Sequence, residues 1–299
     1  MEILFINTGK FIDLQKNGSV KDKLVLITGA NSGIGYTTTL SMAVKGASVV
    51  MVCRDKQKGE QARASVIAAT GNNTVDLMLC DLSSLNSVRR FAEVFLKKYT
   101  KLDVLINNAG GMFDEKYLSE DCYEWTFAVN HLGHFLLTHF LSGALKKAAP
   151  SRIINVSSKA HLFGKMVFDD LMFEKRRYSS AAAYAQAKLA NVLFTIELNK
   201  RLKQDGVTAY SLHPGAVRTN FFNTIPAGWK FVASLLAPLL ISPEKGAETS
   251  VYLASEPGIE HLSGRYFEKK KPATMNAQAK DPQVASILWM VSAQLTKIN

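Results

Sequence analysis

A phenol and an ammonium group stand four residues apart in the segment Tyr184-Ala-Gln-Ala-Lys188. Residues four apart on a helix share one face, so the two side chains can meet. A free phenol has a pKa of about 10, too high for ready proton exchange at neutral pH, and a nearby ammonium favours the phenolate. The pair therefore predicts a proton donor and acceptor suited to reactions at a carbonyl or alcohol oxygen.

Ser158 supplies a hydroxyl group that fits the same chemistry. It follows the apolar run 152–156, which predicts a buried strand, so Ser158 is expected at the carboxyl edge of a sheet. Ligands bind at that edge in open α/β folds. We expect its hydroxyl to orient a substrate oxygen. Ser157 is the alternative for this role, and its competing function is to cap the loop that follows.

A glycine-rich turn, Thr28-Gly-Ala-Asn-Ser-Gly-Ile-Gly35, stands between a predicted strand over 24–28 and a predicted helix over 33–45. Glycines permit a tight turn and close approach of the backbone, and a helix N-terminus supplies N–H donors to an anion. The spacing is Gly-x-x-x-Gly-x-Gly rather than Gly-x-Gly-x-x-Gly. We predict that this turn binds the pyrophosphate of a dinucleotide through Gly29, Asn31, Ser32, Gly33, Ile34 and Gly35.

The residue after the second predicted strand distinguishes NADP(H) from NAD(H). An acidic residue there binds the ribose 2′-hydroxyl, whereas an arginine accommodates a 2′-phosphate. The strand predicted over 47–53 is followed by Arg54, and Lys58 lies one helical turn further on. Asp55 is an acidic residue next to this position and would favour NAD(H), but its position also suits the cap of the next helix. We therefore favour NADP(H), with NAD(H) as the alternative.

Asp81 and Leu82 follow the third predicted strand, over 75–80. We expect both to line the adenine end of the cofactor site. Asp81 is placed to accept a hydrogen bond from the adenine amino group. The competing interpretation is that Asp81 caps the helix that starts near Ser84.

These motifs need a scaffold in which strands and helices alternate. Apolar runs predict strands over 24–28, 47–53, 75–80, 102–106, 152–156 and 207–212, with helices over 33–45, 57–69, 85–98, 120–147 and 181–203. Such alternation gives a parallel sheet, and right-handed crossovers after a glycine-rich first turn make it doubly wound. The sequence therefore predicts an α/β fold: a single-domain, Rossmann-type doubly wound parallel sheet with helices on both faces.

No linker, repeat or low-complexity tract divides the chain, so we predict one catalytic domain over 21–299 after a loosely docked arm over 1–20. Inside this domain, the apolar excursion 219–242 is interpreted as a lid over an apolar substrate. A shallow membrane-surface contact and an ordinary packed helix are the alternatives. The cap Asp281-Pro282 predicts a C-terminal helix over 279–297 that packs on the body or on a second subunit.

The 299-residue chain has a net charge of +11, which favours anionic partners such as phosphorylated cofactors or acidic lipid headgroups. No nucleic-acid-binding signature accompanies this charge, so nucleic acid is not expected as a partner. Three cysteines without a Cys-x-x-Cys pair fit a reducing compartment, and no metal site is expected. The sequence lacks a signal peptide, so we expect a protein that is cytoplasmic or peripheral on an intracellular membrane, and not secreted.

In combination the motifs resemble the short-chain dehydrogenase/reductase family over residues 22 to about 268. The matching segments, in order, are Thr28-Gly-x-x-x-Gly-Ile-Gly35, Asn107-Asn-Ala-Gly110, Ser158 and Tyr184-x-x-x-Lys188. The resemblance implies that Asn130 helps to hold a water linking Lys188 to a proton relay. It also implies that Lys188 holds the nicotinamide ribose. The further cofactor contacts implied are Asn108, Ala109, Gly110, Tyr184, Pro214, Gly215 and Thr219.

Four stretches are similar to the retinol dehydrogenase branch, which reduces retinal and other apolar aldehydes with NADPH: Val52-Cys-Arg-Asp55, Val156-Ser-Ser-Lys-Ala-His161, Lys188-Leu-Ala-Asn-Val-Leu-Phe194 and Ser211-Leu-His-Pro-Gly215. The 26 positions between Ser158 and Tyr184 (184 − 158) exceed the family's usual dozen or so. The extra loop, 163–179, is expected to shape the substrate entrance. The full-length N-terminal anchor of the membrane-bound members is missing, so a soluble aldehyde or ketone reductase also fits.

We therefore expect an NADP(H)-dependent oxidoreductase that interconverts an apolar aldehyde or ketone and its alcohol, either retinal and retinol or another lipophilic pair. An NADP(H)-sensing scaffold and a peripheral membrane protein with little turnover are the alternatives. The complete Ser–Tyr–Lys set argues against a scaffold, because a sensor does not need an acid/base. Analogy with the family, and nothing else, predicts a homo-oligomer formed through the helices 120–147 and 181–203.

Overall fold

The computed structural model describes residues 20–215 and 241–298 of the chain. The predicted N-terminal arm, apart from Val20, lies outside these residues. So does the predicted lid, apart from its last two residues, and with it Thr219.

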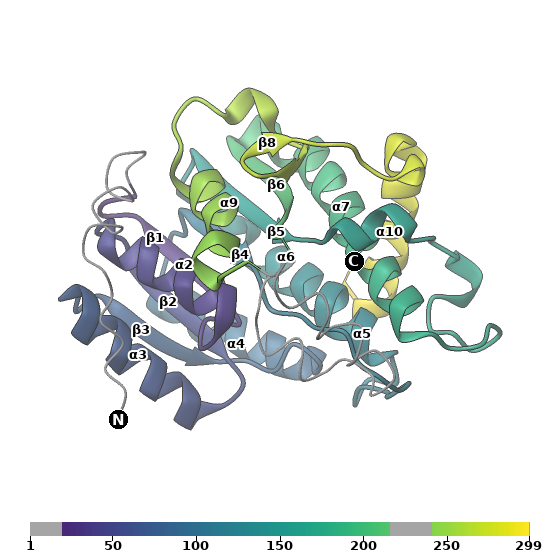
Figure 1. Ribbon diagram of the computed structural model, residues 1–299, viewed down its shortest axis with the longest axis horizontal. Helices are drawn as coiled ribbons and strands as arrows, with labels where there is room; N and C mark the ends of the chain where they lie inside the picture. The colour runs from purple at the N-terminus through teal and green to yellow at the C-terminus, as the bar shows by residue number, and fades with distance from the viewer. Residues whose placement is uncertain (1–19, 216–240, 299) are drawn as a thin grey trace.

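A mostly parallel sheet forms the centre of the described chain, with its strands in the order β3-β2-β1-β4-β5-β6-β7-β8 (Figure 1). The strands are β1 (Leu24–Thr28), β2 (Ser48–Cys53), β3 (Val75–Leu79), β4 (Val104–Asn107), β5 (Ser151–Val156), β6 (Val207–His213), β7 (Tyr266–Glu268) and β8 (Lys271–Pro272). Only β8, in this part of the chain, pairs antiparallel to its neighbour. The winding reverses between β1 and β4, which is where such sheets bind ligands.

Helices cover both faces of the sheet, as predicted (Figure 1). One face carries α2 (Gly33–Val44), α3 (Lys56–Thr70) and α9 (Pro243–Ser255), and the other carries α4 (Leu85–Lys98), α6 (Gly133–Lys147) and α7 (Ser180–Leu202). A further helix, α10 (Pro282–Thr296), packs against α7. The fold is therefore the predicted single-domain, doubly wound Rossmann type.

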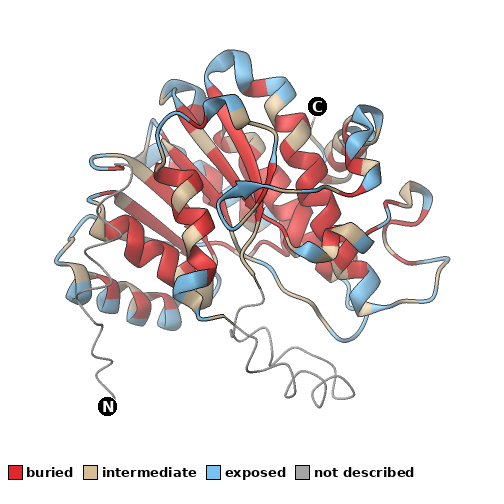
Figure 2. Cartoon of the chain, turned by 45° about the horizontal axis from the view of Figure 1, so that its top comes forward, coloured by how far each residue is buried: buried red, intermediate tan, exposed pale blue. Residues whose placement is uncertain are grey.

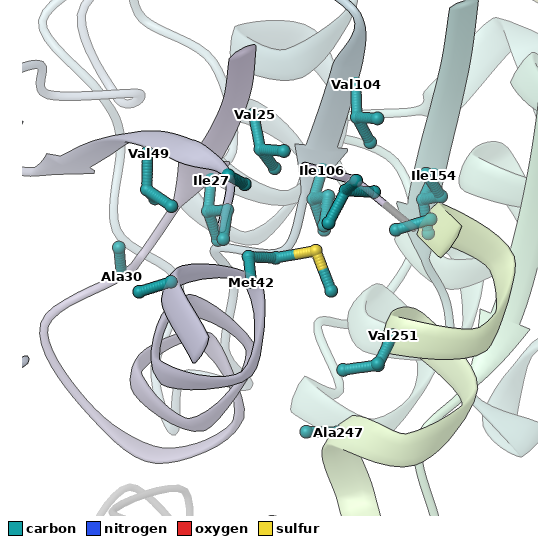
Figure 3. Packing of buried hydrophobic residues seen from close by; sticks show 14 of the residues in the cluster. Val25, Ile27, Ala30, Met42, Val49, Val104, Ile106, Ile154, Ala247 and Val251 are labelled. Atoms are coloured by element: carbon teal, nitrogen blue, oxygen red, sulfur yellow. The ribbon is translucent and has the colours of Figure 1, made fainter. Parts of the chain in front are cut away.

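The strands are apolar almost without interruption because both of their faces are buried (Figure 2). In β1, Val25 and Ile27 pack toward α2 and α9, whereas Leu26 packs toward the helices of the other face. Figure 3 shows Met42 of α2 lying against the first of these faces. Met42 is fully buried, so its truncation to alanine would cost about 2–5 kcal/mol of folding free energy.

The helix predicted over 120–147 is wrong at its beginning. Residues before Trp125 form a turn closed by a bridge between Leu118 and Glu124. The buried Glu124 carboxylate then accepts hydrogen bonds from the N–H groups of Thr126 and Phe127, at 2.9 and 2.8 Å. A short helix, α5 (Trp125–Phe127), leads into a π-helical turn, η1 (Ala128–Leu132), before α6 begins. The cap and the wider turn set the position of Asn130.

The extra loop 163–179 folds against the body around Asp170. The Asp170 carboxylate accepts hydrogen bonds from the backbone N–H groups of residues 174–176 and from Arg176 Nε. Leu171 and Phe173 are buried, so these two side chains contribute to the core. In residues 20–215 and 241–298, no helix has the length and apolar character needed to cross a membrane.

Candidate active site and cofactor cleft

The glycine-rich turn lies at the carboxyl end of β1 and leads directly into α2. Gly29 and Gly33 have φ angles of +65° and +53°, a left-handed conformation that favours glycine. Ser32 precedes the first turn of α2, which contains no acidic residue. The N-terminus of α2 therefore offers backbone N–H groups and a positive dipole to an anion.

The Asn107-Asn-Ala-Gly110 turn braces this loop from the neighbouring strand β4. Asn108 Nδ2 donates to the Thr28 carbonyl at 2.7 Å. The N–H groups of Asn108 and Ala109 donate to Thr28 Oγ1 at 2.9 and 3.0 Å. A Cβ atom at Gly35 would overlap the Gly29 carbonyl oxygen, so the approach of α2 to the loop also requires glycine. The backbone cradle is thus held in place by the protein itself.

A cleft of about 560 Å³ opens beside this cradle at the carboxyl edge of the sheet. Its lining includes seven residues predicted from the sequence: Gly29, Asn31, Arg54, Asp81, Leu82, Ala109 and Gly110. The prediction missed nine others: Thr28, Val52, Cys53, Cys80, Phe113, Tyr117, Leu118, Trp125 and Val129. Clustered aromatic residues just after the Asn107–Gly110 turn were the available signal for part of this wall.

Arg54 and Asp81 face one another at one end of the cleft. Arg54 Nη1 lies 3.9 Å from Asp81 Oδ2, and the arginine side chain is 67% exposed, so its guanidinium group remains accessible to an anion. Asp81 accepts hydrogen bonds from the N–H and the hydroxyl group of Ser83, at 2.9 and 2.6 Å. Ser84, rather than Asp81, caps α4 through the N–H group of Ser87.

Asp55 caps α3, which confirms the alternative interpretation of this residue. Its Oδ1 accepts a hydrogen bond from the Lys58 N–H group at 3.0 Å, and Lys58 Nζ lies 3.9 Å from Oδ2. Lys58 does not line the described cleft. Arg54 is therefore the cation that faces the cleft at the end of β2.

Ser158, Tyr184 and Lys188 meet at the end of β5. Lys188 Nζ lies 5.4 Å from the centre of the Tyr184 ring and donates to the Val156 carbonyl at 3.2 Å. The Ser158 hydroxyl forms a hydrogen bond with Tyr184 and accepts one from the Ala160 N–H group at 3.2 Å. Ser157 instead donates to the Lys188 carbonyl at 2.7 Å, so the two serines have separate roles.

Burial changes the electrostatics of this pair. It raises the pKa of Tyr184 to about 12, against the opposing effect of the Ser158 hydrogen bond. Burial also lowers the pKa of Lys188 to about 7, so its amine is only partly charged at neutral pH. The sequence-based expectation of a depressed tyrosine pKa is not met in the protein alone, because loss of solvation outweighs the effect of the Ser158 hydrogen bond.

Asn130 approaches the same amine from the π-helical turn η1. Its Nδ2 donates to the carbonyl groups of Gly111 and Thr126, at 2.9 and 2.8 Å. Its Oδ1 is buried and has no hydrogen-bond partner among residues 20–215 and 241–298. A Cβ atom at Gly110 would overlap this Oδ1 and lie 3.2 Å from Lys188 Nζ. Gly110 therefore lets Asn130 Oδ1 and Lys188 Nζ approach the main chain, and the unpaired oxygen fits a bound molecule with a polar hydrogen, such as water.

Pro214 and Gly215 follow β6 at the same edge of the sheet. Gly215 has a φ angle of +99°, and a Cβ atom there would contact Ile241. Gly215, which precedes the predicted lid, therefore lies close to Ile241 near the end of that lid.

Several known proteins are similar to this chain. The model of the short chain dehydrogenase family matches residues 23–228. Human retinol dehydrogenase 13 is 44% identical over 286 residues, which cover 94% of this chain and 86% of that protein. Retinol dehydrogenase 12 of Bos taurus is 46% identical over 280 residues, covering 93% and 87%. The crystal structure of an uncharacterized protein from Mycobacterium Paratuberculosis has a TM-score of 0.78 and 34% identity, covering 96% of this chain and 97% of that one.

The chain belongs to the short-chain dehydrogenase family. Within that family it falls in the retinol dehydrogenase-like branch. It is accordingly an oxidoreductase that acts on an alcohol or carbonyl group with a nicotinamide dinucleotide.

Proposed function

We propose that the protein is an NADP(H)-dependent reductase of apolar aldehydes and ketones that also runs in reverse as an alcohol dehydrogenase. One observation carries the proposal: the Ser158–Tyr184–Lys188 cluster lies at the same sheet edge as a cleft whose far end presents Arg54. A proton donor and a site for a phosphorylated dinucleotide are thereby combined on one rigid frame.

The described residues fit the cofactor. Glycines stand where a side chain would fill the cradle, and the N-terminus of α2 is free of acidic residues. The residues that would hold the pyrophosphate are Gly29, Asn31, Ser32, Gly33, Ile34 and Gly35. Arg54 would bind the 2′-phosphate, with Lys58 adding positive charge. The rest of the cofactor would contact Asp81, Leu82, Asn108, Ala109, Gly110, Tyr184, Lys188, Pro214, Gly215 and Thr219.

The nicotinamide, when bound, supplies or accepts the hydride, and the protein handles the proton. Ser158 holds the substrate oxygen by a hydrogen bond. Tyr184 donates its phenolic proton to that oxygen during reduction and removes the proton during oxidation. Lys188 binds the nicotinamide ribose, and the unpaired Oδ1 of Asn130 holds a water that reprotonates the site.

The likeness to retinol dehydrogenases supports an apolar substrate. The predicted lid, with its apolar side chains, supports the same class and leaves shallow contact with a membrane surface as an accessory property. A homo-oligomer is also part of the proposal. The α7 face is partly covered by α10, so α10 would take part in an interface there.

The test is loss of NADPH absorbance with all-trans-retinal and a series of medium-chain aldehydes, repeated with NADH. We expect rapid oxidation of NADPH and slow oxidation of NADH. Faster turnover with NADH would contradict the cofactor assignment. Absence of turnover with every carbonyl, together with tight NADPH binding by calorimetry, would instead favour the scaffold alternative.

The variant Tyr184→Phe tests the chemistry in the same assay. It should lose about 100- to 10,000-fold in kcat and keep its affinity for NADPH, because only the proton-transfer group is removed. Unchanged kcat would show that another group exchanges the proton.

A further inference from the structure

His134 lies buried between two of the motifs, in the first turn of α6. Its Nε2 is 2.9 Å from Thr28 Oγ1, which begins the glycine-rich turn. Its Nδ1 is 3.1 Å from the main-chain oxygen of Asn130. One imidazole ring thus joins the cofactor cradle to the turn that carries Asn130.

The direction of these hydrogen bonds follows from counting donors and acceptors. Thr28 Oγ1 accepts from the N–H groups of Asn108 and Ala109, which uses both of its lone pairs. Its own hydrogen then points to His134 Nε2, since the other acceptor within reach, the Ile106 carbonyl, lies at 3.4 Å. Nε2 must therefore be unprotonated.

A neutral imidazole with an unprotonated Nε2 carries its hydrogen on Nδ1. That hydrogen points to the Asn130 carbonyl, which can only accept. Burial, together with the charge of Lys188, lowers the pKa of His134 to about 4, so the ring stays neutral near pH 7. The hydrogen bonds that link Asn108, Thr28, His134 and the Asn130 carbonyl then all run in one consistent direction.

We propose that His134 is a positioning residue whose two ring nitrogens serve different ends of the reaction. Nε2 fixes Thr28 and hence the cradle for the dinucleotide. Nδ1 fixes the main chain of Asn130 and hence its unpaired Oδ1 beside Lys188. Only the part of this inference that concerns kcat rests on the proposed function.

Two substitutions separate the two nitrogens, because each amide side chain reproduces one of them. His134→Asn keeps a donor near the position of Nδ1 but loses the acceptor for Thr28. His134→Gln places an acceptor near the position of Nε2 but loses the donor to Asn130. The matched controls are His139→Asn and His139→Gln, since His139 lies on the same helix and has no hydrogen bond to either motif in the described residues.

The measurements are NADPH affinity by calorimetry, kcat and KM with the best carbonyl substrate, and Tm. We expect His134→Asn to weaken NADPH binding about 10-fold with kcat nearly intact. His134→Gln should lower kcat about 10-fold with NADPH affinity nearly intact. Thr28→Val should also weaken NADPH binding, and adding His134→Asn to it should have little further effect, because Thr28→Val already removes the hydrogen bond to Nε2 along with those from the N–H groups of Asn108 and Ala109.

A buried histidine that only supports the fold would give a different result. Both His134 variants would then lose Tm, affinity and kcat in parallel, and His134→Asn would add its full effect to that of Thr28→Val. That outcome overturns the inference. Binding of NADPH does not require turnover, so the calorimetric arm decides the role of Nε2 even if no carbonyl is reduced and the proposed function fails.

Discussion

His131 Nε2 lies 2.8 Å from Ser292 Oγ, and the two residues are 161 positions apart in the chain. His131 is the neighbour of Asn130 in the π-helical turn, whereas Ser292 is buried on the inner face of α10. The end of α10 is fixed by Tyr123, which donates to the Leu295 carbonyl at 2.7 Å, and by Arg89, which donates to the Thr296 carbonyl at 2.6 Å. The last described helix therefore supports the turn that carries Asn130.

Ser292→Ala tests this support. The substitution removes the hydrogen bond between Ser292 and His131 Nε2, in a buried ring whose Nδ1 has no hydrogen-bond partner among the described residues. We expect a loss of about 1–3 kcal/mol in the free energy of unfolding and a lower kcat, with NADPH affinity unchanged. Urea denaturation and steady-state kinetics measure these quantities. Ser286→Ala, on the outer part of α10, is the control and should leave kcat unchanged.

Arg54→Ala should separate the two cofactors. Loss of one charge-assisted contact to a phosphate corresponds to about 1.5–3 kcal/mol, so KM for NADPH should rise about 10- to 100-fold while KM for NADH changes little. Lys58→Ala should have a much smaller effect, because Lys58 interacts with Asp55 and does not line the cleft. Equal losses with NADPH and NADH would show that Arg54 supports the fold rather than the 2′-phosphate.

The Lys188→Met substitution should lower catalytic activity and raise the Tm at neutral pH. The buried amine has a pKa of about 7 against an ordinary value of 10.5, so the folded state disfavours its charged form. This cost is complete below pH 7 and is relieved as pH rises from 7 to 10.5, because in that range the folded protein has lost the proton and the unfolded chain still holds it. The variant should therefore have a higher Tm than the wild type at pH 6–7, and the difference should shrink toward pH 10.

The Lys188→Met variant should nevertheless lose nearly all turnover. Val156 O keeps a hydrogen bond from Asn191 Nδ2 at 3.1 Å, so removal of the lysine does not strand that carbonyl. Calorimetric melting at pH 6, 7, 9 and 10 gives the trend. A Tm that falls at every pH would show that the amine stabilises the fold.

Gly110→Ala should harm catalysis and also lower the free energy of unfolding, because Gly110 has a φ angle of +156° and a Cβ atom there would overlap the buried Asn130 Oδ1. The added methyl group would meet Asn130 Oδ1 and approach Lys188 Nζ. We expect kcat to fall about 10- to 100-fold, since small displacements of catalytic groups are costly. Gly143→Ala is the control: that glycine is exposed in α6 and has open space around it, so the change should stabilise the protein by about 0.5–1 kcal/mol. A normal kcat in Gly110→Ala would mean that the space beside Asn130 is unused.

Much of the scaffold was predictable because its strands are buried on both faces and so form continuous apolar runs, as in β1 and β5. The placement of Arg54 at the end of β2 followed directly from that pattern. The π-helical turn could not be predicted, because the spacing of apolar residues in the sequence does not show where a helix takes one extra residue in a turn. The role of Glu124 as a cap was equally hidden, since it depends on the bridge to Leu118.

The pKa values of the site residues were the second property that the sequence did not predict. Sequence spacing identifies the neighbours Tyr184 and Lys188 but not how much water reaches them, and burial decides both pKa values. The aromatic part of the cleft, which includes Phe113 and Trp125, comes from an irregular segment whose course no periodic pattern describes. His134 was visible as a histidine on a helix, but its partner Thr28 is 106 positions away.

The long-range contact between His131 and Ser292 also has a consequence for the order of events during translation. Every residue that lines the described cleft lies between Thr28 and Val129. All the residues that line this cleft are thus synthesised before the second half of the protein. The turn that carries Asn130 acquires its outer support only when Ser292 has left the ribosome, so the reactive centre is completed well after the cofactor cleft.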